Sequence, residues 1–371
     1  MAACSSPNVS PSSPRSRILR HTFSRNHVRV SAQSRSPFPL EHFESLEFPS
    51  AARFMWANGA RVGPGLRKLP LEVAWLEQCT FRKWNEQICT KARLLEKATP
   101  NKQGSPLVWD DGADAAAKEL WNNATTWLAK RYPDKYDVDK HKVKPRTTVE
   151  TAYDKDHTTG LDAFVALASI IQEDIFLMRA TPEHPEGYVF VAGASCFSFD
   201  PVKRKNKGLL SLHEPVPWYP EMAAAVRRAF DNLNVDRPLY RANFAFQNFD
   251  DVITTDVPWH PRFEERIAAD ELDAKAGHTS YFDTTQPVPT TPEGAKELYV
   301  RVEYETLTRL PINDDFILFT VKTYVDKLDE FPKDAKLALL EGLQRADDGQ
   351  KSYKSIDTPE LYEALISYLS L

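Results

Sequence analysis

Apolar residues recur at helical or strand spacing along most of the chain, and this pattern predicts its secondary structure. Helical spacing occurs in six segments: residues 72–97, 114–132, 159–178, 220–233, 333–346 and 358–369. Runs typical of strands lie at residues 188–199, 239–249, 297–305 and 316–324. Helices come first and last, with strands and one helix between them. This order favours an α+β fold with an antiparallel sheet over a doubly wound α/β fold.

Two of the predicted strands form a natural pair. In residues 297–305 the charged side chains of Arg301, Glu303 and Glu305 lie on one face and apolar side chains on the other. We expect this segment to pair with residues 316–324 as an antiparallel hairpin with a long connection. Residues 134–158, where Lys and Asp are interleaved, are instead expected to form a loop or surface extension.

The first 40 residues differ in composition from the rest of the chain. They are rich in Ser, Arg and Pro and contain six arginines and no acidic residue. This composition is typical of a mitochondrial presequence, with a disordered tail as the alternative. We therefore expect a disordered basic tail at residues 1–44 and one large domain at residues 45–371. The expected location is the cytoplasm, or the mitochondrion if the tail is a presequence.

Composition excludes several classes of function. The net charge is −5, and without the +6 of the first 40 residues the remainder carries −11, so electrostatics give no reason to bind nucleic acid. No run approaches the roughly 20 apolar residues of a membrane span. The sequence has no glycine-rich nucleotide-binding loop. Its four cysteines lack C-x-x-C spacing, which argues against a zinc or iron–sulfur site and favours a reducing compartment.

His213 is the first candidate for chemistry. It ends a short apolar segment and precedes Pro215, Pro217 and Pro220. Each proline fixes its own φ and disfavours helix in the residue before it, so the histidine stands at the root of a stiff turn. An axial haem ligand needs an imidazole held in one orientation beside apolar walls. From the residues alone, a histidine that hydrogen-bonds locally is the favoured alternative.

Two adjacent carboxylates form the second candidate. Glu173 and Asp174 fall in the later turns of the helix predicted at residues 159–178, where they oppose the helix dipole. An arginine partner or a functional site would compensate for that position. An ordinary structural ion pair is the alternative.

Charged side chains on the predicted strands form the third candidate. Arg241 and Asn243 share one strand face and can point into a pocket, for instance towards haem propionates or bound oxygen. Arg309 and Lys322 can pair with carboxylates or propionates. The alternatives are a solvated strand face and a charged hairpin face.

These segments together resemble the haem-dependent oxidative N-demethylase alpha-subunit-like family over about residues 50–330. The motifs that carry the resemblance are Gly65-Leu-Arg-Lys-Leu, Gln172-Glu-Asp, His213-x-Pro-Val-Pro, Arg241-x-Asn243, Glu305-Thr-Leu-x-Arg309-Leu-Pro and Phe319-Thr-x-x-Thr-Tyr324. They occur in the family's order. The histidine motif and the motif that begins at Glu305 are the most specific of them.

The resemblance implies a PAS-type haem domain, an antiparallel sheet flanked by helices, that holds one haem b. Its implied activity is the oxidation by O₂ of a small secondary or tertiary amine such as dimethylamine, with release of formaldehyde. Electrons would come from NADPH through flavin and iron–sulfur centres on a separate reductase.

The resemblance also implies roles for individual residues. His213 would be the proximal iron ligand, Arg241 and Arg309 would contact propionates or the distal pocket, and Glu173 and Asp174 would support that pocket. Asn243 and Lys322 are further cofactor-binding candidates.

The sequence departs from the family's pattern at two places. Phe244 stands where the family usually has Trp, and Tyr304-Glu305 stands where it usually has Arg-Gln. The resemblance therefore does not fix the substrate. The alternatives are a non-catalytic haem sensor of PAS type and a degenerate interaction module.

Overall fold

The structure is a computed structural model, and it describes part of the chain. The described residues are 51–52, 54–55, 65–69, 76–78, 81–148, 151–213, 216, 219–254, 257, 259, 282–283 and 286–371, without the side chains of residues 81 and 82. The tail expected at residues 1–44 lies outside these residues.

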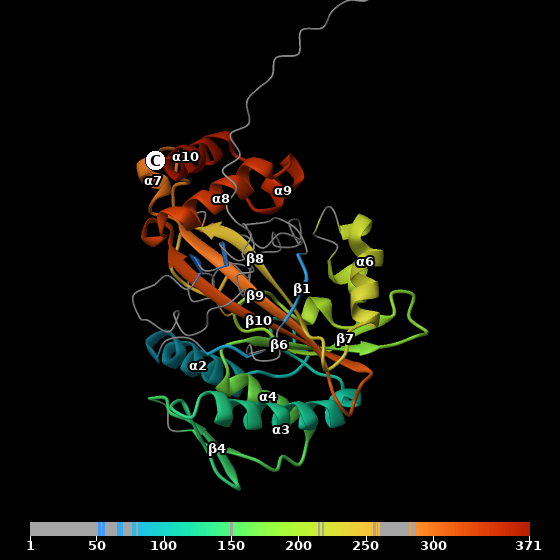
Figure 1. The fold of residues 1–371 in the computed structure, drawn as a ribbon. Helices are drawn as coiled ribbons and strands as arrows, with labels where there is room; N and C mark the ends of the chain where they lie inside the picture. The colour runs from blue at the N-terminus through green and yellow to red at the C-terminus, as the bar shows by residue number, and fades with distance from the viewer. Residues whose placement is uncertain are drawn as a thin grey trace, which may run out of the picture. The chain divides into compact units, whose positions relative to one another are not determined.

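A seven-stranded antiparallel sheet forms the centre of the fold (Figure 1). Its strands follow the order β1 (Arg67–Lys68), β8 (Leu239–Gln247), β9 (Tyr299–Arg309), β10 (Phe316–Lys327), β6 (Asp174–Ala180), β7 (Tyr188–Ala194) and β2 (Leu107–Val108). The expected hairpin is confirmed, because β9 and β10 pair in antiparallel register from Ile317 opposite Arg309 to Lys327 opposite Tyr299. The predicted α+β class is confirmed as well.

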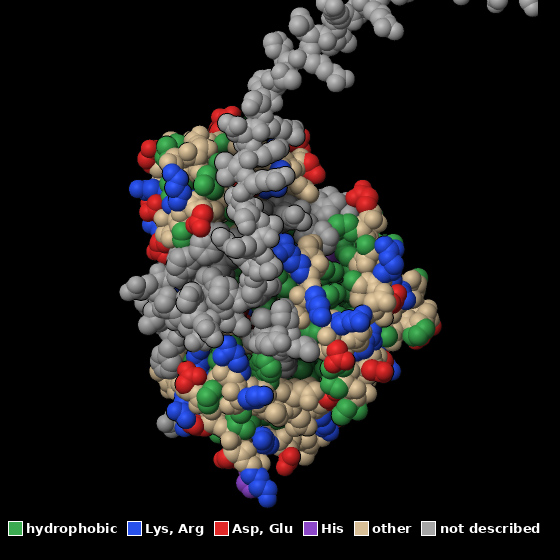
Figure 2. All heavy atoms as spheres, in the orientation of Figure 1, with side chains coloured by type: hydrophobic (Ala, Val, Ile, Leu, Met, Phe, Trp, Pro, Cys, Tyr) green, Lys and Arg blue, Asp and Glu red, His purple; other side chains and the backbone are tan. Residues whose placement is uncertain are grey.

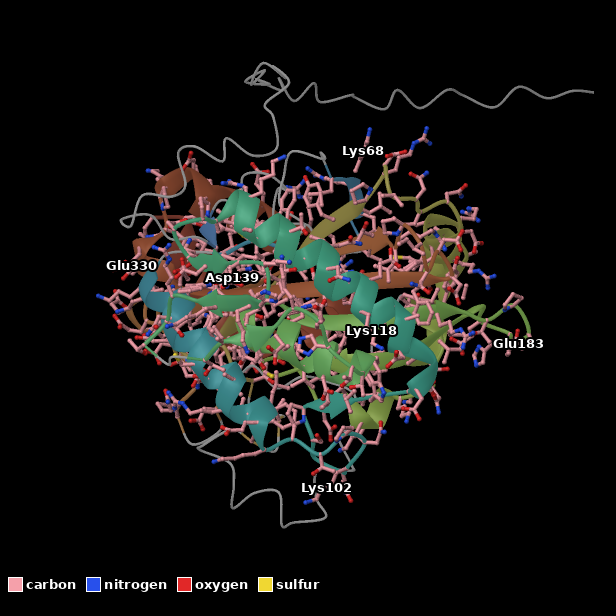
Figure 3. The ribbon with its side chains drawn as sticks, turned by 90° about the horizontal axis from the view of Figure 1, so that it is seen from below. Lys68, Lys102, Lys118, Asp139, Glu183 and Glu330 are labelled. Carbon is pink, nitrogen blue, oxygen red and sulfur yellow. The ribbon has the colours of Figure 1, made fainter. Side chains whose placement is uncertain are left out.

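Three helices cover one face of the sheet. They are α2 (Phe81–Glu96), α3 (Asp114–Arg131) and α4 (Gly160–Ile170), and Figure 3 shows α3 lying across this face with Lys118 labelled on it. The Thr159 side chain caps α4 by accepting a hydrogen bond from the Asp162 N–H. Ile175 and Leu177 of β6 point into this core, as the two-residue period of a strand requires.

The opposite face of β6 packs against different helices. Phe176 and Met178 join a cluster with α5 (Leu209–Leu212) and α6 (Tyr219–Asp231). These two helices belong to the connection between β7 and β8. A cavity lies between α5, α6 and the sheet.

The end of the sheet formed by β8 to β10 has its own helices. They are α7 (Pro292–Ala295), α8 (Lys333–Arg345), α9 (Asp348–Tyr353) and α10 (Pro359–Leu369). The predicted helices at residues 333–346 and 358–369 match α8 and α10 to within one residue at each end. Short 3₁₀ turns lie at η2 (Asp111–Ala113), η3 (Val202–Arg204) and η6 (Leu328–Glu330).

The helix predicted at residues 159–178 is wrong in its second half. Helix α4 ends at Ile170, and β6 begins at Asp174. A continuous apolar run fits a buried strand as well as a buried helix, and here pairing decides, because β6 is hydrogen-bonded on both sides, to β10 and β7. Glu173 and Asp174 therefore stand at the start of a strand and do not oppose a helix dipole.

The loop expected at residues 134–158 also needs correction. It contains a small antiparallel sheet of β3 (Tyr136–Val138), β4 (Lys142–Pro145) and β5 (Tyr153–Asp154). Tyr136 and Val143 are buried in the core with α2, α3 and α4, so a few apolar side chains anchor this otherwise charged segment. Within the described ranges, no helix has the length and apolar character that crossing a membrane requires.

Candidate functional site: a cavity beside His213

A cavity of about 220 Å³ lies between the sheet and helices α5 and α6. Much of its wall is aromatic or contributed by methionine, including Phe176, Met178, Phe190, Phe199, Met222 and Phe319. Its polar lining consists of Ser198, Arg204, His213, Tyr219, Arg241, Asn243, Glu303, Glu305 and Tyr353. A largely apolar pocket with a few convergent polar groups is the usual form of a ligand site.

His213 is held in one orientation at the end of α5. Its Nδ1 lies 2.7 Å from the carbonyl oxygen of Leu209, and because a carbonyl only accepts, Nδ1 carries the proton and donates. The ring stacks on Tyr219, with centroids 4.2 Å apart and planes 1° from parallel. Burial lowers the pKa of His213 to about 4, so the imidazole is neutral near pH 7 and Nε2 keeps its lone pair.

Two residues of the cavity lining carry buried hydroxyls that make no hydrogen bond to any described residue. They are Ser198 and Tyr219, which are only 5% and 3% exposed. Buried polar groups in folded proteins are nearly always hydrogen-bonded. Both hydroxyls therefore have capacity left for a bound molecule.

One end of the cavity is charged. Arg241 stands directly opposite Glu305 across β8 and β9, with Nε 3.0 Å from Oε2, although the N–H is not aligned as a hydrogen bond. Asn243 stands opposite Glu303 and donates to its carboxylate over 3.2 Å. Lys354, which follows α9, donates to the Asn243 side-chain oxygen over 2.6 Å.

Burial shifts the ionisation of these groups. Burial raises the pKa of Glu305 to about 7, with Arg241 opposing the shift and Glu303 adding to it. Burial lowers the pKa of Lys354 to about 7, opposed by Glu303. Burial also acts to raise the pKa of Glu303, but Arg301 and Asn243 outweigh it and hold that pKa below its usual value. Two groups at this end thus titrate near neutral pH.

Glu173 does not line the cavity. Its carboxylate accepts hydrogen bonds from the Glu77 N–H over 2.5 Å and from the Gln78 side chain over 2.8 Å. Burial raises its pKa, and the charge of Lys322 partly offsets that rise. These contacts are those of a satisfied structural group.

Asp174 is also absent from the cavity lining, yet it anchors part of the wall. It accepts from the backbone N–H groups of Cys196 and Phe197 over 2.9 and 3.0 Å, and Lys91 lies 3.6 Å away. These contacts hold the start of the loop that carries Ser198 and Phe199. The Phe199 ring in turn stacks on Phe176 at 5.2 Å and 14°.

Arg309 and Lys322 lie away from the cavity lining. Arg309 donates to the carbonyl oxygens of Phe230 and Leu233, at the end of α6, over 2.9 and 2.6 Å. It thereby satisfies helix-end acceptors. The Lys322 amine donates to the Gln87 side chain of α2 over 3.0 Å. The structure therefore brings His213, Arg241 and Asn243 together and leaves Glu173, Asp174, Arg309 and Lys322 outside the cavity.

Several cavity residues were not candidates from the sequence. Ser198 and Tyr353 belong to unremarkable local sequence, and Tyr219 was not singled out although it stands in the proline-rich segment after His213. Lys354 lies 111 residues from Asn243, its hydrogen-bond partner. Arg204 carried a weak signal, since it sits in a run of basic residues.

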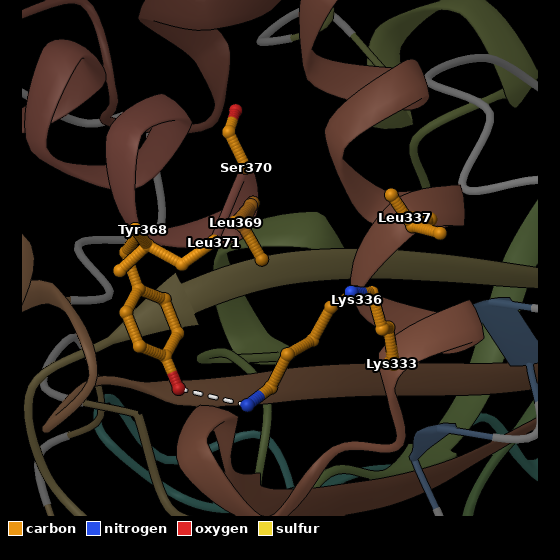
Figure 4. Close-up of a pocket in the computed structure, with 7 residues that line it drawn as sticks. All are labelled: Lys333, Lys336, Leu337, Tyr368, Leu369, Ser370 and Leu371. Carbon is orange, nitrogen blue, oxygen red and sulfur yellow. Dashed lines mark hydrogen bonds between the residues drawn. The ribbon is translucent and has the colours of Figure 1, made fainter.

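A second pocket, of about 210 Å³, lies between α8 and α10 (Figure 4). There the Lys336 amine donates to the Tyr368 hydroxyl over 2.8 Å, and that hydroxyl donates to Asp329. Its lining contains no histidine, cysteine or carboxylate side chain. It offers no redox chemistry comparable to that of the His213 cavity.

Comparison with known proteins identifies a family for this chain. A family model described as "Haem-dependent oxidative N-demethylase, alpha subunit-like" matches residues 74–361. Among curated proteins, none matches this sequence significantly. The matched range includes His213, both polar pairs of β8 and β9, and Tyr353.

Proposed function

The chain belongs to the haem-dependent oxidative N-demethylase alpha-subunit-like family, and from that premise we propose that it binds one haem b at His213 and oxidatively demethylates a small secondary or tertiary amine. One observation carries the proposal. A neutral imidazole, fixed through Nδ1 and with Nε2 left as a lone pair, borders an apolar cavity.

The residues present suit a haem. Metal-bound histidines usually donate their other ring N–H to a carbonyl or carboxylate, as His213 does to Leu209. The aromatic wall suits a porphyrin face. Arg204 and Arg241 both line the cavity and both lower the pKa of His213 through their charge, so two cations lie near the imidazole for the propionates. Within the described residues no group of three metal-binding side chains occurs, and a haem needs only an axial ligand from the protein.

The chain's own residues would prepare the substrate. A bound haem supplies oxygen activation and one-electron chemistry. An alkylammonium ion that enters the cavity must lose a proton before its nitrogen can be oxidised. Glu305 lines the cavity with a pKa raised to about 7, which suits it to accept that proton near neutral pH. Asn243 and Arg241 hold the carboxylates of this end in place.

Asp174, Glu173, Arg309 and Lys322 have supporting roles in this proposal. Asp174 positions the loop of Ser198 and Phe199, while Arg309 fixes the end of α6. Glu173 holds the segment of Glu77 and Gln78, and Lys322 holds α2 through Gln87. None of them touches the substrate.

We also propose a PAS-type ancestry for the domain. Numbered along the chain, the five central strands β6, β7, β8, β9 and β10 lie in the order 2-1-5-4-3, and α5 and α6 are inserted between the second and third. This antiparallel centre with inserted helices on the ligand side supports the proposal.

An enzyme of this type needs an electron donor. The sequence has no glycine-rich nucleotide-binding loop and no cysteine spacing for an iron–sulfur cluster. We therefore propose a separate reductase that carries flavin and iron–sulfur centres and oxidises NADPH. We place the protein in the cytoplasm, or in the mitochondrion if residues 1–40 act as a presequence.

Formaldehyde production tests the activity. Haem-loaded protein with a surrogate reductase, NADPH, O₂ and dimethylamine should release formaldehyde. Glu305→Ala should lower turnover at least tenfold while the Soret band of the resting protein is unchanged. A haem-loaded protein that forms no aldehyde from any small methylamine would contradict the demethylase proposal.

A further inference from the structure

A turn of four cations lies next to the helix that carries His213. Residues 203–207, here called the basic turn, contain Lys203, Arg204, Lys205 and Lys207. The chain outside its first 40 residues carries a net charge of −11. The four cations of the basic turn outnumber two carboxylates that lie close to it, Asp200 and Glu186, so the turn is a local exception in an acidic body. Figure 2 shows Lys and Arg side chains interspersed with Asp and Glu on the face that includes α6.

The backbone holds the basic turn rigidly. Phe190 of β7 exchanges two hydrogen bonds with it, accepting from the Asn206 N–H over 2.9 Å and donating to the Lys207 carbonyl over 3.0 Å. The Lys205 amine donates to the Trp109 carbonyl over 2.9 Å. Asn206, with φ at +62°, makes the sharp reversal, a conformation that asparagine tolerates better than most residues. The backbone of the turn and the Lys205 side chain are thus fixed in place.

The basic turn spans the wall between the cavity and the surface. The Arg204 guanidinium lies 4.2 Å from the Phe199 ring centre, donates to the Leu212 carbonyl and lines the cavity. Lys203 is exposed and Lys207 half-buried, and neither makes an ion pair within the described part of the chain. Leu210, three residues before His213, is 44% exposed.

We infer that the basic turn and Leu210 form the docking surface for an acidic electron-donor protein. This inference rests on the proposed function, which requires one-electron transfer from another protein. Cations such as Lys203 and Lys207 attract an acidic partner and speed its association. An exposed leucine beside them supplies an apolar contact. In each transfer the donor's reduced centre loses one electron and the haem iron passes from the ferric to the ferrous state.

The first test measures binding, with plant-type ferredoxin, an acidic [2Fe–2S] protein, as the probe. The full chain should bind oxidised ferredoxin at low ionic strength, and the affinity should fall steeply with salt. K203E/K207E should weaken binding at least tenfold and remove most of the salt dependence. L210S should weaken binding severalfold with the salt dependence kept. The matched control K130E/K140E makes the same change of charge on two exposed lysines outside the basic turn, one near the end of α3 and one between β3 and β4.

The second test measures electron transfer to the haem-loaded protein by stopped flow under carbon monoxide. K203E/K207E should slow reduction by ferredoxin at least tenfold at low salt, and the control should stay within about twofold of the unaltered protein. The docking surface would be overturned if the two double variants slowed reduction equally, or if neither of them slowed it.

The two tests separate this inference from the proposed function. Ferredoxin binding needs no haem. A chain that binds ferredoxin through the basic turn but takes up no haem would overturn the demethylase and leave the surface standing. A haem-loaded chain that ferredoxin does not recognise would overturn the surface alone.

Discussion

Two regions of the molecule bury carboxylates, and the protein treats them differently. Beneath α2, Asp174 accepts from two backbone N–H groups beside Lys91, and Glu173 accepts from a backbone N–H and an amide. In the cavity, Glu305 faces one arginine in a contact that is not aligned as a hydrogen bond. A buried carboxylate that accepts well-aligned hydrogen bonds stabilises the folded structure. A carboxylate beside a cavity that lacks such hydrogen bonds keeps the capacity to bind a proton or a ligand.

The largest effect on stability should come from replacing Asp174, which accepts two backbone hydrogen bonds beneath α2. Asp174→Ala leaves Lys91 as a buried charge without its carboxylate and removes the acceptor for two backbone N–H groups, so we expect a loss of about 3–5 kcal/mol in unfolding free energy. Urea denaturation measures it. Asp174→Asn, which keeps the shape and one acceptor, should cost less. A variant as stable as the parent would show that Asp174 does not hold the wall.

Ionisation of Glu305 should destabilise the folded protein as the pH rises. Its pKa rises on folding from 4.5 to about 7, so the folded state binds more protons, and stability falls as pH rises from about 4.5 to 7. Glu305→Gln removes this loss. The variant should therefore gain stability relative to the parent between pH 5 and pH 8, by roughly 1–3 kcal/mol.

Paired urea titrations at pH 5 and pH 8 measure that difference. Any contribution of Glu173 and Asp174, whose pKa values are also raised, is common to both proteins and cancels. A difference that is flat with pH would contradict a raised pKa at Glu305.

The unpartnered hydroxyls should give the smallest effect on folding. Tyr219→Phe keeps the stack on His213 and deletes a buried hydroxyl without a partner, so the unfolding free energy should stay the same or rise by up to about 1 kcal/mol. Haem affinity or the Soret position should change, because Tyr219 lines the cavity. Destabilisation by more than about 1 kcal/mol would mean that the hydroxyl has a structural partner.

The fold was predictable where the sequence has a clear period. Strand β8 and the β9–β10 hairpin follow from alternating side chains, and α8 and α10 follow from helical spacing. The boundary between α4 and β6 was not predictable, because an apolar run continues through Ile170 and Ile171 without a glycine or proline. Strand pairing to β10, about 140 residues later, decides it.

The cavity was predictable only in part. His213, Arg241 and Asn243 were candidates because a stiff turn and a strand face limit where side chains can point. Glu173 and Asp174 do not line the cavity, and their sequence did not reveal this, because adjacent buried carboxylates look alike whether they serve a site or a structure. Lys354 needed the tertiary fold, since α9 brings it to the sheet from the end of the chain.

The most direct test of the account is the visible spectrum of the protein expressed with haem, ferric and then reduced with carbon monoxide. His184 offers a matched control, because it is a half-buried histidine whose Nδ1 is also hydrogen-bonded to the backbone, in a loop outside the cavity. We predict one haem per chain in the parent and in His184→Ala. We predict loss of the histidine-type spectrum in His213→Ala, with recovery on addition of imidazole. A folded parent without haem, or a His213→Ala variant with an unchanged spectrum, would contradict the central claim that His213 holds the iron.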